Sequence, residues 1–276
     1  MVYFLLEDGN TGLLYKMLNK YIEYRNNILV RDCKIIALNG IKNIYKYVRD
    51  LKIKDDDLYL IFMDYVYDNN VVMTYYKRIR TIISKYPRNY MIFEMLSFEF
   101  LVLGSPFMRG CFKPYNDKHM IDYKMCLNYT DLLLSTVNNE ISWYRNNELL
   151  EYMLSRLNIS KPDIEISDTG EFIFKHFEKT TVISIERVAY QILNNITYYT
   201  MFKYEKGRFK KCWYDDCCVM GSIIGKKCTI YSSSYSSKYK ISRFFKDCGI
   251  YDFINKAYRR YKQIRKISGG NKNEKI

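Results

Sequence analysis

Leu-Tyr-Leu-Ile-Phe-Met-Asp, residues 58–64 of this 276-residue chain, indicates the class of fold more clearly than any other segment. Six apolar residues in a row, bounded by the acidic run 55–57 and by Asp64, are typical of a strand buried on both faces. Such strands occur in parallel sheets that helices cover on either side. The stretch therefore predicts an α/β protein in which an acidic side chain closes a buried strand.

The residues before this strand repeat one pattern twice. Residues 2–6 form a wholly apolar run that ends at Glu7, and after a polar, glycine-containing turn with an N-cap candidate, apolar residues recur at helical spacing over 13–22. Residues 34–38 form another apolar run, and residues 44–51 carry a second helical face. Each unit predicts a strand followed by a helix.

The residues after the strand continue the pattern and then change. Residues 71–83 predict a helix and residues 90–93 a fourth strand, so we expect a parallel four-stranded sheet, because parallel strands need crossover connections. Gly and Pro cluster over 104–114, which predicts a boundary between an α/β domain at 1–110 and a mainly α-helical region at 111–276.

Within the second region the patterns are weaker. We expect helices over 119–157 and 181–202, a strand over 171–177 and a basic amphipathic helix over 250–264. The sequence shows no internal repeat.

Composition narrows the class of protein. Apolar residues make up 48% of the chain, which excludes a disordered protein, and 44 Lys and Arg against 30 acidic residues favour nucleic acid or another polyanion as partner. No apolar run approaches the roughly 18 residues of a membrane span, and no cationic leader opens the chain. We therefore expect a cytoplasmic protein whose eight cysteines are thiols or ligands.

Acidic residues follow the predicted strands. Glu7 and Asp64 would meet at the edge where parallel strands end, close enough, if the first and third strands are neighbours, to hold one Mg²⁺ or Mn²⁺. Asp68 and Glu99 are further candidate ligands. The alternative is that each acid caps a helix or stays solvated.

This order resembles the Toprim family over residues 2–103. Leu6-Glu7-Asp8-Gly9 has an acid after the first strand, Leu38-Asn39-Gly40 a glycine after the second, and Asp64 follows the third. The resemblance implies metal-assisted cleavage or phosphotransfer, with Glu7 in acid/base or metal chemistry and Asp64 holding the metal ion.

One position departs from the family. Toprim proteins usually carry Asp-x-Asp after the third strand, whereas Val66 stands second in Asp64-Tyr65-Val66, so that Asp68 would have to substitute. Residues 98–101, Phe-Glu-Phe-Leu, are similar to the acidic segment of Toprim relatives that accompany ATPases in bacterial phage defence.

Two clusters in the second region have chemistry of their own. Four thiols within 17 residues have the number of ligands that a structural Zn²⁺ needs, but their spacing is unfavourable and ordinary thiols are the alternative; they are Cys212, Cys217, Cys218 and Cys228. The basic helix would contact nucleic-acid phosphates, or else a protein partner or an anionic membrane surface, through Lys256, Arg259, Arg260, Lys262, Arg265 and Lys266.

Two functions follow as hypotheses. The first is a Mg²⁺-dependent, Toprim-like nuclease that acts on DNA or RNA in a defence system or a mobile element, with Glu7 and Asp64 as its catalytic residues. The second is a catalytically inactive Toprim-like protein that binds nucleic acid or regulates a partner such as an ATPase.

Overall fold

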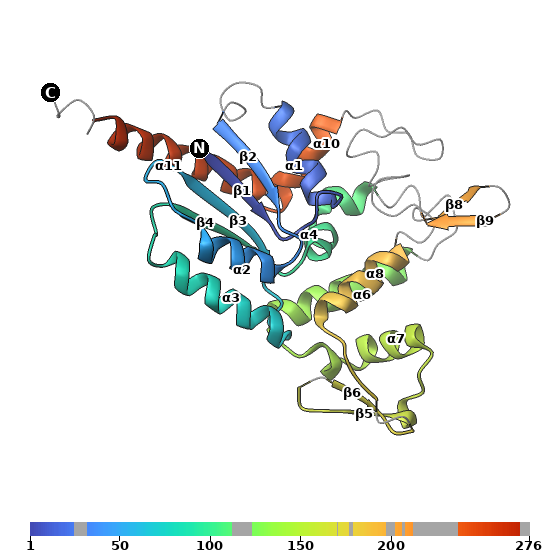
Figure 1. Ribbon diagram of the computed structural model, residues 1–276. Coiled ribbons are helices and arrows are strands. Elements are labelled where there is room, and N and C mark those ends of the chain that lie inside the picture. Colours follow the sequence, from blue (N-terminus) through green and yellow to red (C-terminus); the bar gives the residue numbers. More distant parts are fainter. Residues whose placement is uncertain are drawn as a thin grey trace.

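The centre of the protein is a four-stranded parallel sheet. The computed structural model describes residues 1–24, 32–111, 123–169, 171–176, 179–196, 202–205, 208–211 and 237–270 (Figure 1). The strands lie in the order β2-β1-β3-β4, and their bounds are β1 (Val2–Leu6), β2 (Cys33–Ala37), β3 (Leu58–Asp64) and β4 (Tyr90–Met95). One helix follows each strand: α1 (Leu13–Tyr24), α2 (Ile41–Asp50), α3 (Asn70–Ile83) and α4 (Phe98–Gly104). The predicted α/β fold is confirmed.

Strand β3 explains why its sequence is apolar throughout. It lies between β1 and β4, and its side chains alternate between two hydrophobic clusters on opposite faces of the sheet. Leu58, Leu60 and Phe62 face one cluster, whereas Tyr59, Ile61 and Met63 face the other. Because both faces are covered, no position before Asp64 is open to a polar side chain.

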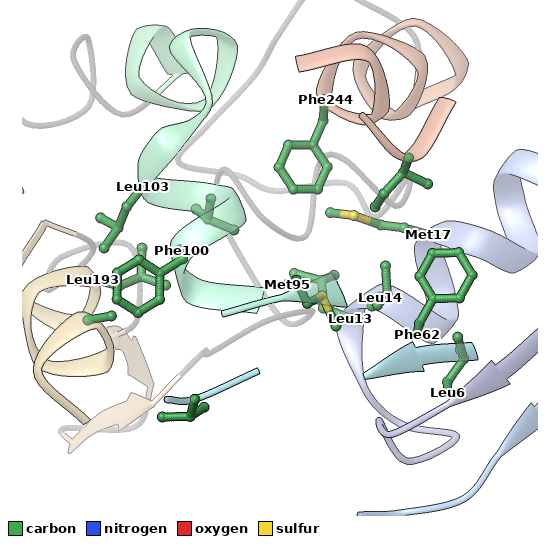
Figure 2. Packing of buried hydrophobic residues seen from close by; sticks show 14 of the residues in the cluster. Leu6, Leu13, Leu14, Met17, Phe62, Met95, Phe100, Leu103, Leu193 and Phe244 are labelled. Atoms are coloured by element: carbon green, nitrogen blue, oxygen red, sulfur yellow. The ribbon is translucent and has the colours of Figure 1, made fainter. Parts of the chain in front are cut away.

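Both ends of the chain build the layers around this sheet. Helices α2 and α3 cover one face, while α1 covers the other together with α10 (Ser237–Asp247) and α11 (Ile250–Gly270) (Figure 1). Phe62 and Phe253 of α11 have ring centroids 5.4 Å apart, and Figure 2 shows Phe244 of α10 facing Met17 of α1. The division of the chain at residue 110 stays a prediction. The sheet formed by residues before 110 is, however, covered on one face by α10 and α11 from the C-terminal part of the chain.

A smaller lobe adjoins the carboxyl end of the sheet. Its helices are α6 (Tyr123–Asn138), α7 (Asn147–Leu157) and α8 (Ile185–Ile196), with short 3-10 turns η2 (Trp143–Arg145) and η3 (Lys161–Asp163). An antiparallel sheet completes it: β5 (Ile164–Ile166), β6 (Glu171–Phe174) and β7 (Lys179–Val182). A separate hairpin consists of β8 (Phe202–Glu205) and β9 (Arg208–Lys211).

This lobe is anchored by Trp143, which stacks on Phe172 with centroids 5.7 Å apart and donates its indole N–H to the carbonyl of Ile183 at 2.8 Å. Leu193 of α8 packs near Phe100 and Leu103 of α4, which joins the lobe to the sheet (Figure 2).

One expected helix differs from the prediction at its ends. Of the stretch 181–202, Thr181 and Val182 belong to β7 and Phe202 to β8, and α8 occupies 185–196 among the described residues. The β-branched run Thr180-Thr181-Val182 favours a strand, and Ser184 then starts the helix, since its carbonyl and side chain accept the backbone N–H of Arg187. No described helix has the length and apolar character needed to cross a membrane.

Candidate active site

Glu7 and Asp64 converge at the carboxyl edge of the sheet. Strands β1 and β3 are neighbours in register, with Leu6 opposite Phe62, so the residues that follow them emerge side by side. The Oε2 of Glu7 accepts the backbone N–H of Asp64 at 3.0 Å. The condition for Glu7 and Asp64 to meet, that the first and third strands are neighbours, is therefore fulfilled.

The other oxygen of Glu7 stabilises the start of α2. Its Oε1 accepts the backbone N–H of Ile41 at 3.2 Å, a hydrogen bond that α2 lacks from its own N-cap residue, Gly40. Gly40 has φ 116°, a conformation that favours glycine, and its N–H donates to the carbonyl of Glu7 at 2.7 Å. The glycine that closes the second strand thus brings a helix N-terminus to the carboxylate.

Two further acids at this edge bind helix N-termini. Asp8 accepts the backbone N–H groups of Leu14 and Tyr15 at the start of α1, although it lies several residues before the helix. The Oδ2 of Asp68 accepts the backbone N–H of Ile185 at the start of α8, at 2.8 Å. Helix capping, the alternative reading of these acids, therefore describes part of what they do, and the positive ends of the helices face the site.

The position of the missing second Asp lies in the apolar core. The side chain of Val66 is fully buried in the cluster that includes Phe62 and Met95. Asp68 is the next acidic residue along the chain, and its Oδ1 is buried without a hydrogen-bond partner among the described residues.

A further acid, Glu186 of α8, lies near the carboxylates of the sheet edge, and the sequence analysis did not identify it. Together with Asp68 and Glu99 it lines a cavity of about 860 Å³ between the sheet and the smaller lobe. A glutamate in the first turn of a helix is common, so its sequence carries no specific signal. Only the packing of α8 against α4 brings it here.

The electrostatics of this edge favour the neutral carboxyl form. Burial, followed by the negative charges of Glu7 and Glu186, raises the pKa of Asp64 well above its ordinary value. Burial and then Glu99 and Glu7 raise the pKa of Glu186 to about 7. Burial also raises the pKa of Glu7, although its two backbone hydrogen bonds act in the opposite direction.

Metal binding can be tested against the donors present. The carboxylate of Asp64 accepts no hydrogen bond in the described part of the chain. The other side chains that could bind a metal ion nearby are also carboxylates, and their oxygens suit Mg²⁺ or Mn²⁺. However, no three His, Cys, Asp or Glu side chains among the described residues are grouped to hold one ion. Glu7, Asp64 and Glu186 fit a divalent ion in charge and donor type, and their side chains would need to turn toward it.

The predicted phosphate-binding residues of α11 fall into two groups. On a helix with about 3.6 residues per turn, Lys256, Arg259, Lys262 and Lys266 lie opposite the buried side, and all four are exposed. Arg260 instead donates to the carbonyls of Pro87 and Tyr90, and Arg265 donates to Asp32 at 3.0 Å.

The contacts of Arg260 and Arg265 also locate the basic part of α11. Their partners lie just before or at the first residue of β4 and just before β2, at the amino edge of the sheet, whereas Phe253 near the start of α11 contacts Phe62 and Phe93. The helix therefore runs away from the carboxylates. The four cysteines considered for Zn²⁺ lie outside the described residues.

The comparisons with known proteins add no relative: no family model, curated protein or solved structure matches this chain. The fold and the acidic edge therefore define the class of site, an α/β protein with carboxylates at the ends of its parallel strands.

Proposed function

We propose that this protein is a Toprim-like nuclease of the cytoplasm that depends on Mg²⁺ or Mn²⁺ and cleaves phosphodiester bonds of DNA or RNA. The observation that carries the proposal is the convergence of Glu7 and Asp64 from neighbouring parallel strands. The net charge of +14 supports a polyanionic substrate. A setting in defence or a mobile element stays a prediction.

In this proposal each residue has a role that follows from its surroundings. Asp64 would hold the metal ion, because its carboxylate accepts no hydrogen bond in the described structure. Glu186 and Glu99 lie near it. When bound, the ion would stabilise the negative charge that develops on the phosphate. Glu7 would accept or donate a proton, because burial shifts its pKa toward neutral pH.

The second function, an inactive nucleic-acid-binding or regulatory subunit that partners an ATPase, also has an observation in its favour. Both carboxylate oxygens of Glu7 already accept backbone N–H groups. Val66, at the position of the second Asp, is buried and has no side-chain oxygen that could bind a metal ion. In that case the acids would serve mainly to hold helices at the sheet edge.

Asp64→Asn separates the two functions. A Gln at position 7 would lose one of two backbone hydrogen bonds, whereas Asn at position 64 breaks none that the described structure contains. We expect Asp64→Asn to reduce cleavage at least a hundredfold without lowering the thermal unfolding temperature, measured on labelled single- and double-stranded DNA and RNA with Mg²⁺, Mn²⁺ or EDTA.

Glu94→Gln is the matched control. Glu94 lies near the end of β4, but its carboxylate points to α3, where it accepts the hydroxyl of Tyr76 at 2.7 Å and pairs with Arg80. Equal cleavage by wild type and Asp64→Asn would reject the site. No metal-dependent cleavage by the wild type on any substrate would favour the regulatory function.

A further inference from the structure

A second basic surface lies on the face of the sheet opposite α11. The helices α2 and α3 pack side by side there and carry six Lys and Arg against one acid, Asp50 (Figure 1). All six basic side chains are exposed, since the buried sides of both helices face the sheet. These residues are Lys42, Lys46, Arg49, Lys77, Arg78 and Arg80.

Four of these cations have no carboxylate partner within hydrogen-bond distance among the described residues. Arg49 donates to both oxygens of Asp50, at 2.7 and 2.8 Å, and Arg80 pairs with Glu94 at 3.3 Å. In the described part of the chain, Lys42, Lys46, Lys77 and Arg78 form no ion pair. They are therefore available to an external anion.

Two tyrosines organise the middle of this surface. The rings of Tyr45 on α2 and Tyr75 on α3 lie 5.7 Å apart, and the guanidinium of Arg78 stands 5.9 and 5.8 Å from their centroids. A guanidinium held against aromatic rings loses less side-chain freedom when its N–H groups bind a phosphate. The arrangement thus combines positive charge with aromatic rings at the boundary between the two helices.

The surface also begins where the carboxylates are. The first residue of α2, Ile41, donates its backbone N–H to Glu7, and Lys42 follows it directly. Both helices start at the carboxyl edge of the sheet, because each follows a parallel strand. The basic part of α11, by contrast, lies toward the amino edge.

We propose that the exposed face of α2 and α3, defined by Lys42, Lys46, Lys77 and Arg78, binds the phosphate backbone of nucleic acid next to Glu7 and Asp64. The inference rests on the proposed function in one respect, that the polyanion is nucleic acid. Its contacts are to phosphates, so affinity is independent of base sequence.

Two quadruple variants of the full-length protein test this surface. The first changes Lys42, Lys46, Lys77 and Arg78 to Gln, and the second changes Lys256, Arg259, Lys262 and Lys266 of α11 to Gln. Gln keeps helix propensity while removing charge. Circular dichroism and thermal unfolding verify that both fold, and fluorescence anisotropy on duplexes of two unrelated sequences gives affinity against salt.

We expect the α2–α3 variant to flatten the slope of log affinity against log salt by about 3.6 on both duplexes, since each of the four lost phosphate contacts contributes about 0.9. An unchanged slope in this variant, with a flattened slope in the α11 variant, would overturn the inference and leave nucleic-acid binding intact.

Failure of the inference and failure of the proposed function are distinguishable. Binding without cleavage, with the slope still lowered by the α2–α3 variant, would reject the nuclease and support the surface. If the wild type binds no duplex but the α2–α3 variant loses binding to anionic phospholipid vesicles, the proposed partner is wrong.

Discussion

At the residue scale, the site is built from carboxylates that bind backbone amides. Glu7, Asp8 and Asp68 each follow a strand, and each accepts N–H groups at the start of a different helix. Such hydrogen bonds, about 1.5 to 3 kcal/mol each when one partner is charged, hold the edge together. Asp64 differs from the other three, because its carboxylate has no such partner in the described structure.

Gly12 illustrates how closely these acids are packed. A Cβ at this position would occupy the space of the Asp8 carboxylate. We expect Gly12→Ala to displace Asp8 from the start of α1 and to lower the free energy of unfolding by roughly 0.5 to 2 kcal/mol, the range for loss of a cap. Denaturant unfolding measures the change.

Gly104→Ala is the control for this substitution. Gly104 ends α4, and a Cβ there would meet no atom within 4 Å. Its effect should be near zero or slightly stabilising, because Ala has the higher helix propensity. A Gly12→Ala protein as stable as Gly104→Ala would show that Asp8 can move without cost.

At the element scale, the C-terminal helices belong to the sheet. Ile254, Ala257 and Ile264 of α11 and Phe244 and Phe245 of α10 are buried. A carboxylate oxygen of Asp247, at the end of α10, also accepts the hydroxyl of Ser105 at 2.8 Å and the N–H of Phe107 at 2.9 Å. The two helices are therefore held by buried side chains along their length and by Asp247 at the junction between them.

Removal of residues 237–276 should prevent folding of the remainder. One face of the sheet would lose α10 and α11 and keep only α1 of the three described helices that cover it, and fully burying each large apolar side chain is worth about 1.5 to 3 kcal/mol. Removal of residues 268–276 alone is the control, since Ile267 before them is already 54% exposed. A soluble, cooperatively unfolding protein that lacks 237–276 would contradict this description of the layers.

At the scale of the whole molecule, the acidic edge links the sheet to the smaller lobe. Asp68 binds the start of α8, and Glu186 of α8 lies among the carboxylates that follow the strands. The stability of the joined lobes should therefore depend on how many of these groups are ionised.

Stability should fall as the pH rises. Because the pKa of Glu186 is raised to about 7 in the folded protein, its contribution is fully present below its unfolded pKa of about 4.3 and is lost as the pH passes 7. The free energy of unfolding in EDTA should drop by roughly 2 to 3 kcal/mol between pH 5 and pH 8 on account of this group, and Asp64 and Glu7 act in the same direction.

Glu186→Gln should remove its share of this dependence, as measured by denaturant unfolding at both pH values. Glu171→Gln, on β6 in the wall of the same cavity, is the matched control and should leave the difference unchanged. If Glu186→Gln keeps the full difference, the pH dependence arises elsewhere.

Local sequence patterns are sufficient to predict the parallel sheet and the meeting of Glu7 and Asp64 at its carboxyl edge. The uninterrupted apolar run of β3 requires two covered faces, and the period of the helices predicts parallel crossovers, so Glu7 and Asp64 had to emerge at one edge. Local patterns suffice here because strand burial and helix spacing are properties of neighbouring residues.

Only the tertiary structure decided which other groups meet these two acids. Glu186 comes from a helix that follows Asp64 by more than a hundred residues, and the burial of Val66 depends on the packing of α4 and α1 against β3. The tyrosines beneath Arg78 likewise face each other because α2 and α3 pack side by side. Contacts between distant segments depend on how whole layers dock, and no local spacing in the chain records that.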